Sequence, residues 1–275
     1  MAAEIWREVA DRVFVRRYAT WGSEAFDQNI GAVLGRDGLV VIDTRASHRL
    51  ADALRAEIEE LSRLPIAAVV NTHHHWDHTF GNARFLPTPI WGHVRCAKRV
   101  RDDGDAMRSR VIAQAPEYAN ELNEVVFTPP DQTFSDVATV ELGDRQLNLL
   151  YLGHGHTDND IVIEVPDSGV LFAGDLLEND AAPSYGDAFP RAWAITVRER
   201  LLPLVTNVVV PGHGGVADRS FVADQAADLA AMAELGARLA AGELDEEDAV
   251  GRAPFPAATA RTALSRARLE LATGE

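Results

Sequence analysis

The segment His73–His78 places four histidines and one aspartate within six residues, directly after the apolar run Ile66–Val70. A run of this kind is typical of a strand buried in a sheet, so the histidines fall in the loop at a strand end. Imidazole and carboxylate are the usual zinc ligands where thiolates are absent, and the chain has one cysteine, Cys96. A surface histidine run would not normally follow a buried strand or contain an aspartate. The segment therefore predicts a metal site at a sheet edge.

The spacing within this loop indicates more than one metal. Residues two apart in an extended segment point the same way, so His73 and His75 can face one ion. Asp77 and His78 follow one step further and would face a neighbouring point. A single catalytic zinc takes three protein ligands and keeps one open position, and four candidates in one loop exceed that need. His74, between two of them, should point away and be either an outer partner of a ligand or a structural residue.

The rest of the chain alternates strand-like and helix-like patterns. Strands are predicted at 12–18, 30–34, 39–42, 66–70, 137–142, 146–152, 161–165, 170–172 and 207–210. Helices are predicted at 47–64, 94–100, 192–202, from 218 onward and at 257–271. Two packed sheets covered by helices on the outside would accommodate this order.

The charge balance limits the choice of partner. The chain has 42 acidic and 26 basic residues, a formal net charge of −16. Such a surface repels phosphate backbones, so we expect a small-molecule substrate and no nucleic acid. No stretch approaches the about 18 apolar residues of a membrane span, and the first residues lack the apolar core of a signal peptide. We therefore expect no membrane association and a cytoplasmic location. The sequence leaves the oligomeric state open.

The run His73–His78 fits the H-x-H-x-D-H signature of the metallo-β-lactamase superfamily. Four further motifs follow the family's order: Val40–Thr44 with its strand-ending aspartate, Gly155-His156-Thr157, Gly174-Asp175 and Pro211-Gly212-His213-Gly214. The chain is similar to this superfamily over roughly residues 12 to 215. The resemblance implies an α+β fold, a four-layer αββα sandwich. We expect one domain over residues 1–275, with a core at about 12–215 and a C-terminal helical extension at about 218–275.

The resemblance also implies a ligand set. Carried over residue by residue, it gives the first metal His73, His75 and His156, and the second metal Asp77, His78 and His213. Asp175 would bridge the two. His154 is the rival of His156 two residues away, but only His156 has the Gly-His-Thr context. Asp43 is either an outer partner that orients a ligand loop or a cap of the next turn.

By this resemblance the chain is a metal-dependent hydrolase with two Zn²⁺ per chain, although iron or manganese also fit the ligand types. A hydroxide bridging the metals would cleave an ester, lactone, thioester or amide bond, with Asp77 orienting the nucleophile. Branches with a cysteine at the second metal are excluded, because Asp175 occupies that place. Two alternatives stay open: a mononuclear iron oxidoreductase similar to persulfide dioxygenases, and a thioesterase similar to glyoxalase II.

The segment 179–193 is rich in proline, glycine and aromatic residues and predicts a loop over the site. Apolar pocket walls are expected from its aromatics and from three others elsewhere: Tyr185, Phe189, Trp193, Trp21, Phe26 and Trp76. Each is equally compatible with core packing, the commoner place for an aromatic side chain.

Overall fold

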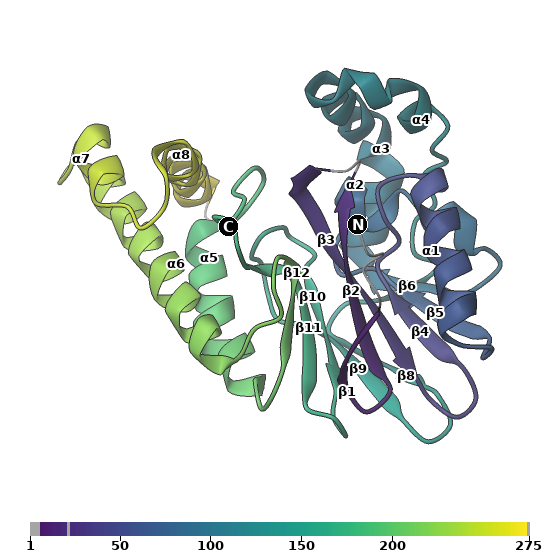
Figure 1. Cartoon of the computed structure of the whole chain (residues 1–275). Coiled ribbons are helices and arrows are strands. Elements are labelled where there is room, and N and C mark those ends of the chain that lie inside the picture. The colour runs from purple at the N-terminus through teal and green to yellow at the C-terminus, as the bar shows by residue number, and fades with distance from the viewer. Residues whose placement is uncertain (1–5, 21–22, 274–275) are drawn as a thin grey trace.

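Two β-sheets lie face to face with helices on both outer surfaces in the computed structural model, which describes residues 6–20 and 23–273 (Figure 1). The first sheet has the order β1 (Arg7–Ala10), β2 (Val13–Thr20), β3 (Ser23–Leu34), β4 (Leu39–Ile42), β5 (Ile66–Val70), β6 (Ile90–His93), β7 (Gln132–Phe134). The second has the order β12 (Val209–His213), β11 (Val170–Glu178), β10 (Ile161–Val165), β9 (Gln146–Tyr151), β8 (Val137–Glu141). The expected αββα sandwich is confirmed.

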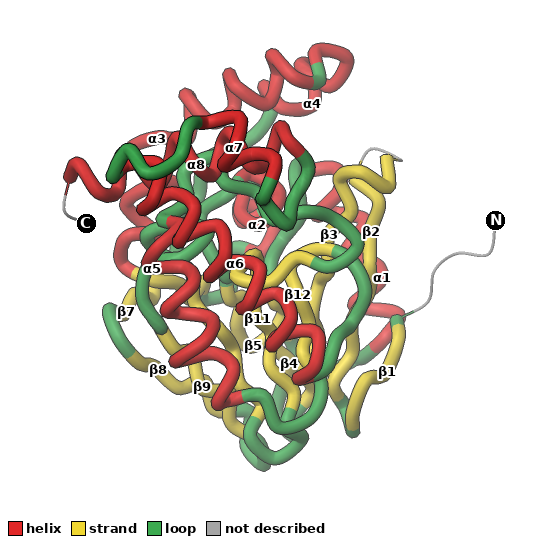
Figure 2. The backbone as a smooth tube through the Cα atoms, turned by 90° about the vertical axis from the view of Figure 1, so that its left-hand side faces the viewer, coloured by secondary structure: helices red, strands yellow, loops and turns green. Residues whose placement is uncertain are grey.

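The helices divide between the two outer surfaces. The helices near the first sheet are α1 (His48–Leu61), α2 (Trp76–Thr79), α3 (Val94–Gln114) and α4 (Ala119–Asn123). The second sheet is covered by α5 (Pro190–Ile195), α6 (Arg219–Ala240), α7 (Glu246–Gly251) and α8 (Ala257–Thr273), which lie together in Figure 2. The C-terminal helices therefore form the fourth layer of the sandwich.

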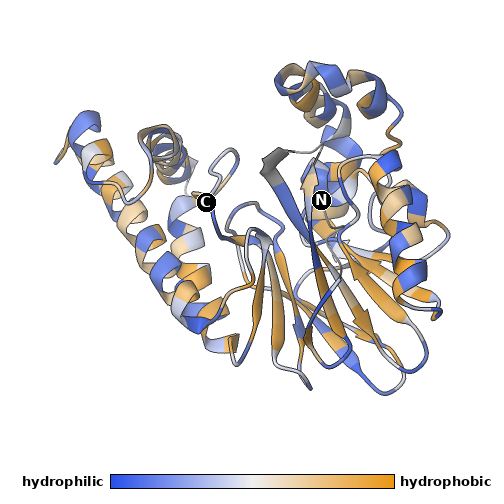
Figure 3. Ribbon diagram, viewed as in Figure 1, coloured by the Kyte–Doolittle hydropathy of each residue, from blue (hydrophilic) through white to orange (hydrophobic). Residues whose placement is uncertain are grey.

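Strand periodicity distributes the apolar side chains between two cores. In β10, Ile161, Ile163 and Val165 face the first sheet, whereas Val162 belongs to the cluster beneath the helices. Alternate residues of a strand point to opposite faces, so a strand buried on both sides is apolar throughout. Figure 3 shows this as apolar strands between two layers of amphipathic helices. The sheets are therefore held both to each other and to their helices.

Most predicted helices and strands lie where the sequence places them, but several differ from the prediction in length. Ser47 caps α1 by accepting a hydrogen bond from the Leu50 N–H, but the helix ends at Leu61, where Ser62 is extended. The helix predicted at 192–202 is instead α5 followed by a π-helical stretch, Thr196–Leu201. The helical stretch predicted from residue 218 onward is divided into two helices, α6 and the short α7.

The strand ends that carry the motifs meet at one edge of the sandwich. β4 and β5 are parallel to each other, as are β11 and β12. β9 and β11 both run antiparallel to β10, so the loop after β9 lies at the edge where β11 ends. No helix in the described ranges is long and apolar enough to cross a bilayer. The single domain, the cytoplasmic location and the lack of a nucleic-acid partner stay predictions from the sequence.

Candidate metal centre

Four of the seven predicted ligands form a first group: His73, His75, His156 and Asp175. His75 Nδ1 lies 3.0 Å from His73 Nε2 and 2.8 Å from His156 Nε2. Asp175 Oδ2 lies 3.4 Å from His156 Nε2 and 3.6 Å from His73 Nε2. Donors on a tetrahedral zinc are about 3.3 Å apart, given zinc–nitrogen distances near 2.0–2.1 Å. These four atoms therefore fit around one ion.

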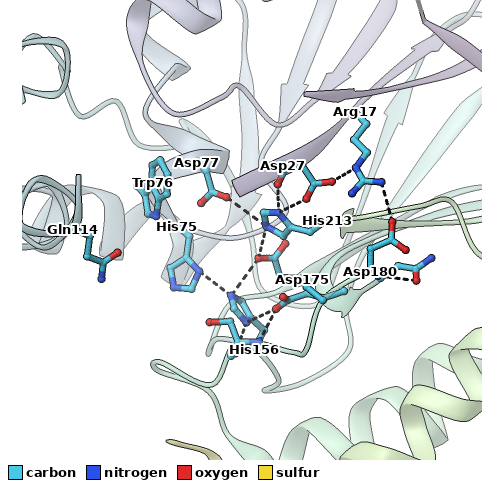
Figure 4. Close-up of a pocket in the computed structure, with 14 residues that line it drawn as sticks. Arg17, Asp27, His75, Trp76, Asp77, Gln114, His156, Asp175, Asp180 and His213 are labelled. Carbon is cyan, nitrogen blue, oxygen red and sulfur yellow. Dashed lines mark hydrogen bonds and ion pairs between the residues drawn. The ribbon is translucent and has the colours of Figure 1, made fainter. Parts of the chain in front are cut away.

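The other three ligands form a second group: Asp77, His78 and His213. Asp77 Oδ2 lies 3.4 Å from Nε2 of His78 and 3.4 Å from Nε2 of His213. The Asp175 carboxylate reaches this group as well, with Oδ1 at 3.3 Å from His78 Nε2 and Oδ2 at 3.2 Å from His213 Nε2. Asp175 thus lies between the two groups (Figure 4). The structure brings all seven residues together, and their binding of metal stays a prediction.

Two buried atoms at the centre of the groups support a cation there. His78 Nε2 and Asp175 Oδ1 make no hydrogen bond to the described part of the chain. The two atoms lie 3.3 Å apart. A buried polar atom without a hydrogen bond costs free energy, which a bound ion would remove. Gly212 allows the carboxylate to approach, because a Cβ atom there would lie 1.8 Å from Asp175 Oδ1. The donor set and the space therefore fit a metal ion.

The signature segment bends between its ligands. His75 is extended and is the N-cap residue of α2 without a side-chain capping hydrogen bond, and the short helix carries Asp77 and His78. The change from extended to helical backbone directs the first two histidine ligands to one group and the next two ligands to the other, because side chains follow the backbone periodicity. The spacing H-x-H-x-D-H is thus the spacing of the loop after β5 followed by one helical turn.

Asp43 is an outer partner of the second group. Its carboxylate accepts hydrogen bonds from the N–H and Oγ1 of Thr72 and lies 2.8 Å from His78 Nδ1. Asp43 has a left-handed backbone, with φ of +66°. Such a conformation is uncommon outside glycine and occurs where surrounding contacts hold it. Of the two roles considered from the sequence, the structure favours orienting a ligand.

Three further outer partners had no signal in the sequence. His75 Nε2 lies 3.0 Å from Oδ1 of Asp187, and His156 Nδ1 lies 3.0 Å from the carbonyl oxygen of Ser184. His213 Nδ1 bonds the carbonyl oxygen of Asp27. Two of the three acceptors are main-chain carbonyls, and Asp187 is 112 residues from His75. Neither kind of partner follows from motif spacing. Such contacts fix the ring orientation and tautomer of a histidine ligand.

The remaining histidines near the site lie outside both groups. His74 Nδ1 accepts a hydrogen bond from Asn159 Nδ2 at 3.0 Å, and its Nε2 lies 3.6 Å from Asp187 Oδ2. His154 Nε2 lies 3.3 Å from an Arg95 nitrogen, and its ring packs 4.5 Å from that of Phe189. Geometry therefore favours His156 over His154 as the candidate ligand.

The two groups differ in protonation. Burial lowers the pKa of His73 well below its usual range and that of His156 to about 4. Burial also lowers the pKa of His78 and His213, but the charges of the neighbouring aspartates have the larger effect. They raise the pKa of His78 well above its usual range and that of His213 to about 9. In His75, the outer carboxylate partner likewise outweighs burial and raises the pKa. The second group therefore holds more protons at neutral pH.

A cavity of about 550 Å³ opens beside the ligands. Most of the residues that line it have polar side chains. The lining residues are Arg17, Asp27, His75, Trp76, Asp77, Gln114, His156, Asp175, Glu178, Asn179, Asp180, Ala181, Ser184 and His213 (Figure 4). Trp76 is the expected aromatic wall that the structure places there. Tyr185 and Trp193 belong instead to the core beneath the C-terminal helices. Phe189 is also buried, Trp21 lies outside the described residues, and so does the side chain of Phe26. Of the six expected aromatic walls, Trp76 is the one that lines this cavity among the described side chains.

Comparisons with known proteins agree with the motifs and the fold. The sequence model of the metallo-beta-lactamase superfamily matches residues 24–213. The metallo-beta-lactamase type 2 of Bacillus cereus is 26% identical over 208 residues, covering 74% of this chain and 73% of that protein. A hydroxyacylglutathione hydrolase from a Synechococcus strain is 30% identical over 137 residues, half of this chain and 43% of that protein. The structure of a metallo-beta-lactamase from Pontibacter korlensis matches with a TM-score of 0.65 and 22% identity, covering 83% of this chain and 99% of that one.

Proposed function

Because this chain belongs to the metallo-β-lactamase superfamily, whose members are metal-dependent hydrolases, we propose that it binds two zinc ions and hydrolyses a small molecule at an ester, lactone, thioester or amide bond. The observation that carries the proposal is the position of Asp175, whose carboxylate lies within 3.6 Å of a donor atom in both ligand groups. A carboxylate has two oxygens and can hold two cations while offsetting their repulsion.

The residues of the site would have different roles in hydrolysis. Bound divalent cations supply Lewis acidity and lower the pKa of water toward neutrality. Asp77 lines the cavity between His78 and His213, where its carboxylate would orient an attacking water. Asp43 and Asp187 hold the rings of His78 and His75, so that these ligands need not reorganise when substrate arrives.

A second cavity, of about 310 Å³, extends the first and favours one kind of substrate. Four residues line both cavities: His75, Trp76, Gln114 and Ser184. The wall that α3 contributes includes the buried side chains of Met107 and Val111 and the exposed Arg110. In the described part of the chain, no carboxylate lies within ion-pair distance of the Arg110 guanidinium. An apolar acyl group that ends in a carboxylate would fit this extension.

The charges that line the first cavity also limit the class of substrate. Five carboxylates line the first cavity beside a single arginine, Arg17, which pairs with Asp27 and Asp180. Such a lining disfavours a polyanion, so we propose a small molecule rather than a nucleic acid as substrate.

One combined measurement tests the function. Protein purified from zinc-supplemented medium would be assayed for metal content and for hydrolysis of lactones, thioesters, aryl esters and β-lactams. We expect two zinc ions per chain and hydrolysis of at least one class, lost on chelation and restored by zinc. One iron per chain without hydrolysis would instead support the mononuclear iron oxidoreductase. A metal content near zero would remove the proposal.

A further inference from the structure

The C-terminal helix α8 lies outside the family match, which ends at residue 213, yet it contacts the segment that supports the first ligand group. Arg266 on α8 donates from Nε to the carbonyl oxygen of Ala188 at 2.8 Å. It also donates from Nη2 to the carbonyl oxygen of Asp187 at 3.0 Å. These two bonds fix the backbone at the residue whose side chain meets His75 Nε2.

A second contact from α8 fixes the other end of the same segment. The buried carboxylate of Glu270 accepts from the N–H of Arg191 at 2.8 Å and from the N–H of Ala192 at 2.9 Å. These groups lie in the first turn of α5, whose own N-cap residue makes no side-chain hydrogen bond. A carboxylate at a helix N-terminus satisfies free N–H groups and interacts favourably with the helix dipole.

The segment 184–192 has two sides with different partners. Tyr185 and Ala188 pack in the same apolar cluster as Ala263 and Leu264 of α8. The other side carries the Ser184 carbonyl and the Asp187 carboxylate to the outer nitrogens of His156 and His75. Both histidines belong to the first group, so the segment links α8 to that group.

The second group takes its outer partners from the first sheet instead. Asp43, directly after β4, bonds His78, and the carbonyl of Asp27 on β3 bonds His213. Neither residue contacts α8 through a hydrogen bond or ion pair among the described residues. The support of the two groups is therefore divided between opposite layers of the sandwich.

We propose that Arg266 and Glu270 are positioning residues for the first metal, and that α8 selectively controls zinc affinity at the first group. This inference rests on the proposed metal site. The chain of contacts runs from α8 through segment 184–192 to His75 and His156, and no other ligand histidine lies on it. Loss of the α8 contacts would let Asp187 and Ser184 move, and the rings they orient would lose their alignment.

The test compares two arginines of one helix in the full-length protein. Arg266→Met keeps the aliphatic stem and removes the guanidinium. The matched control is Arg261→Met, because among the described residues Arg261 bonds only Glu246 and Glu247 of α7. Each would be placed in a His213→Ala background, which leaves the first group intact, and in a His156→Ala background, which leaves the second. Zinc affinity would be measured by competition with a chromophoric chelator, and folding by circular dichroism.

In the His213→Ala background, Arg266→Met is expected to lower the zinc affinity about tenfold. This is the lower end of the range for residues that contact a metal's ligands rather than the metal. In the His156→Ala background its effect should match that of Arg261→Met. Equal effects of Arg266→Met in both backgrounds, or none beyond the control, would overturn the inference. If Arg266→Met does not fold, Arg266→Lys and Glu270→Gln are compared in its place, with the same site selectivity required. Failure of the His213→Ala protein itself to bind zinc would instead contradict the proposed metal site.

Discussion

The Asp43 carboxylate lies 2.8 Å from Nδ1 of His78 and so leaves Nε2 of that ring facing the ligand cluster. The ring is fully buried, and Asp43 is the acceptor that sets its tautomer. Because no other carboxylate contacts Nδ1 in the described structure, this single pair governs how His78 is presented to a metal.

We therefore expect Asp43→Asn to lower the zinc affinity of the second group by about 10–100-fold, as is typical for outer partners of a ligand. The zinc affinity of the first group should change less. Zinc competition measurements check this. Asp52→Asn, which removes an exposed carboxylate paired with Arg84, is the control. Unchanged zinc affinity in Asp43→Asn would show that Asp43 acts only as a structural residue of the turn.

Replacing His156 by alanine should lower the metal content, since two members of the first group, His75 and Asp175, would lose a neighbouring donor 2.8–3.4 Å away. His154→Ala should leave metal content nearly unchanged, because its ring contacts Arg95 and Phe189 instead. Elemental analysis of the two purified variants decides the matter. The reverse pattern would identify His154 as the ligand.

Asp175→Asn keeps the size of the side chain but removes the charge between the two groups. Binding of the second metal should be weakened most, because the first metal keeps three histidine ligands. Activity should fall by more than the about 10–100-fold of outer-shell changes. Metal content and turnover measured on the same preparation check both parts. Two tightly bound metals with near-normal turnover would rule Asp175 out as the bridge.

Zinc affinity should depend on pH more steeply at the second group than at the first. In the metal-free protein the pKa of His213 is about 9 and that of His78 is well above its usual range, so both must lose a proton to bind zinc. In the first group only His75 has a raised pKa. Lowering the pH from 8 to 6 should then weaken zinc binding at the second group by at least roughly 100-fold through His213 alone, with a further loss through His78, and at the first group by at most roughly 100-fold. Competition titrations at several pH values, in the two single-group backgrounds, measure the slopes.

Arg110→Met should raise the KM for a substrate that ends in a carboxylate by about fivefold, equivalent to roughly 1 kcal/mol for an exposed ion pair. The methyl ester of the same substrate should show no change. Arg101→Met, at another exposed position of α3, is the matched control. An equal effect on both substrates would mean that Arg110 does not contact the carboxylate.

The sequence predicted the strands that carry the motifs because their signals are local. β4 and β5 were expected at their observed bounds, since both are short apolar runs limited by turn or loop residues. The candidate ligands His73, His75 and His78 follow from the local pattern of residues 73–78, whereas His156 and His213 follow from the resemblance to the superfamily. β6 and β7 were not predicted: each is a few residues long, and their pairing depends on neighbours distant in sequence.

The roles of aromatic residues and outer partners could not be predicted, because they depend on tertiary packing. Trp193 was a candidate pocket wall, but its ring is fully buried and its Nε1 donates to the Leu176 carbonyl. Asp187 is one of 42 acidic residues and stands in no recognisable motif, and only the fold brings it to His75. A side chain whose partner lies more than a hundred residues away leaves no periodic signal.

Each ligand group contains residues from both halves of the sandwich, so bound metal would affect the stability of the folded chain. His75 and His156 are 81 residues apart, and Asp77 and His213 lie still further apart in the chain. An ion bound by such residues closes a long loop and removes conformational freedom from the unfolded chain, as a disulfide bond does. This chain has a single cysteine and can form no internal disulfide. Its long-range cross-links would be set by the supply of metal, independently of the redox state of its surroundings.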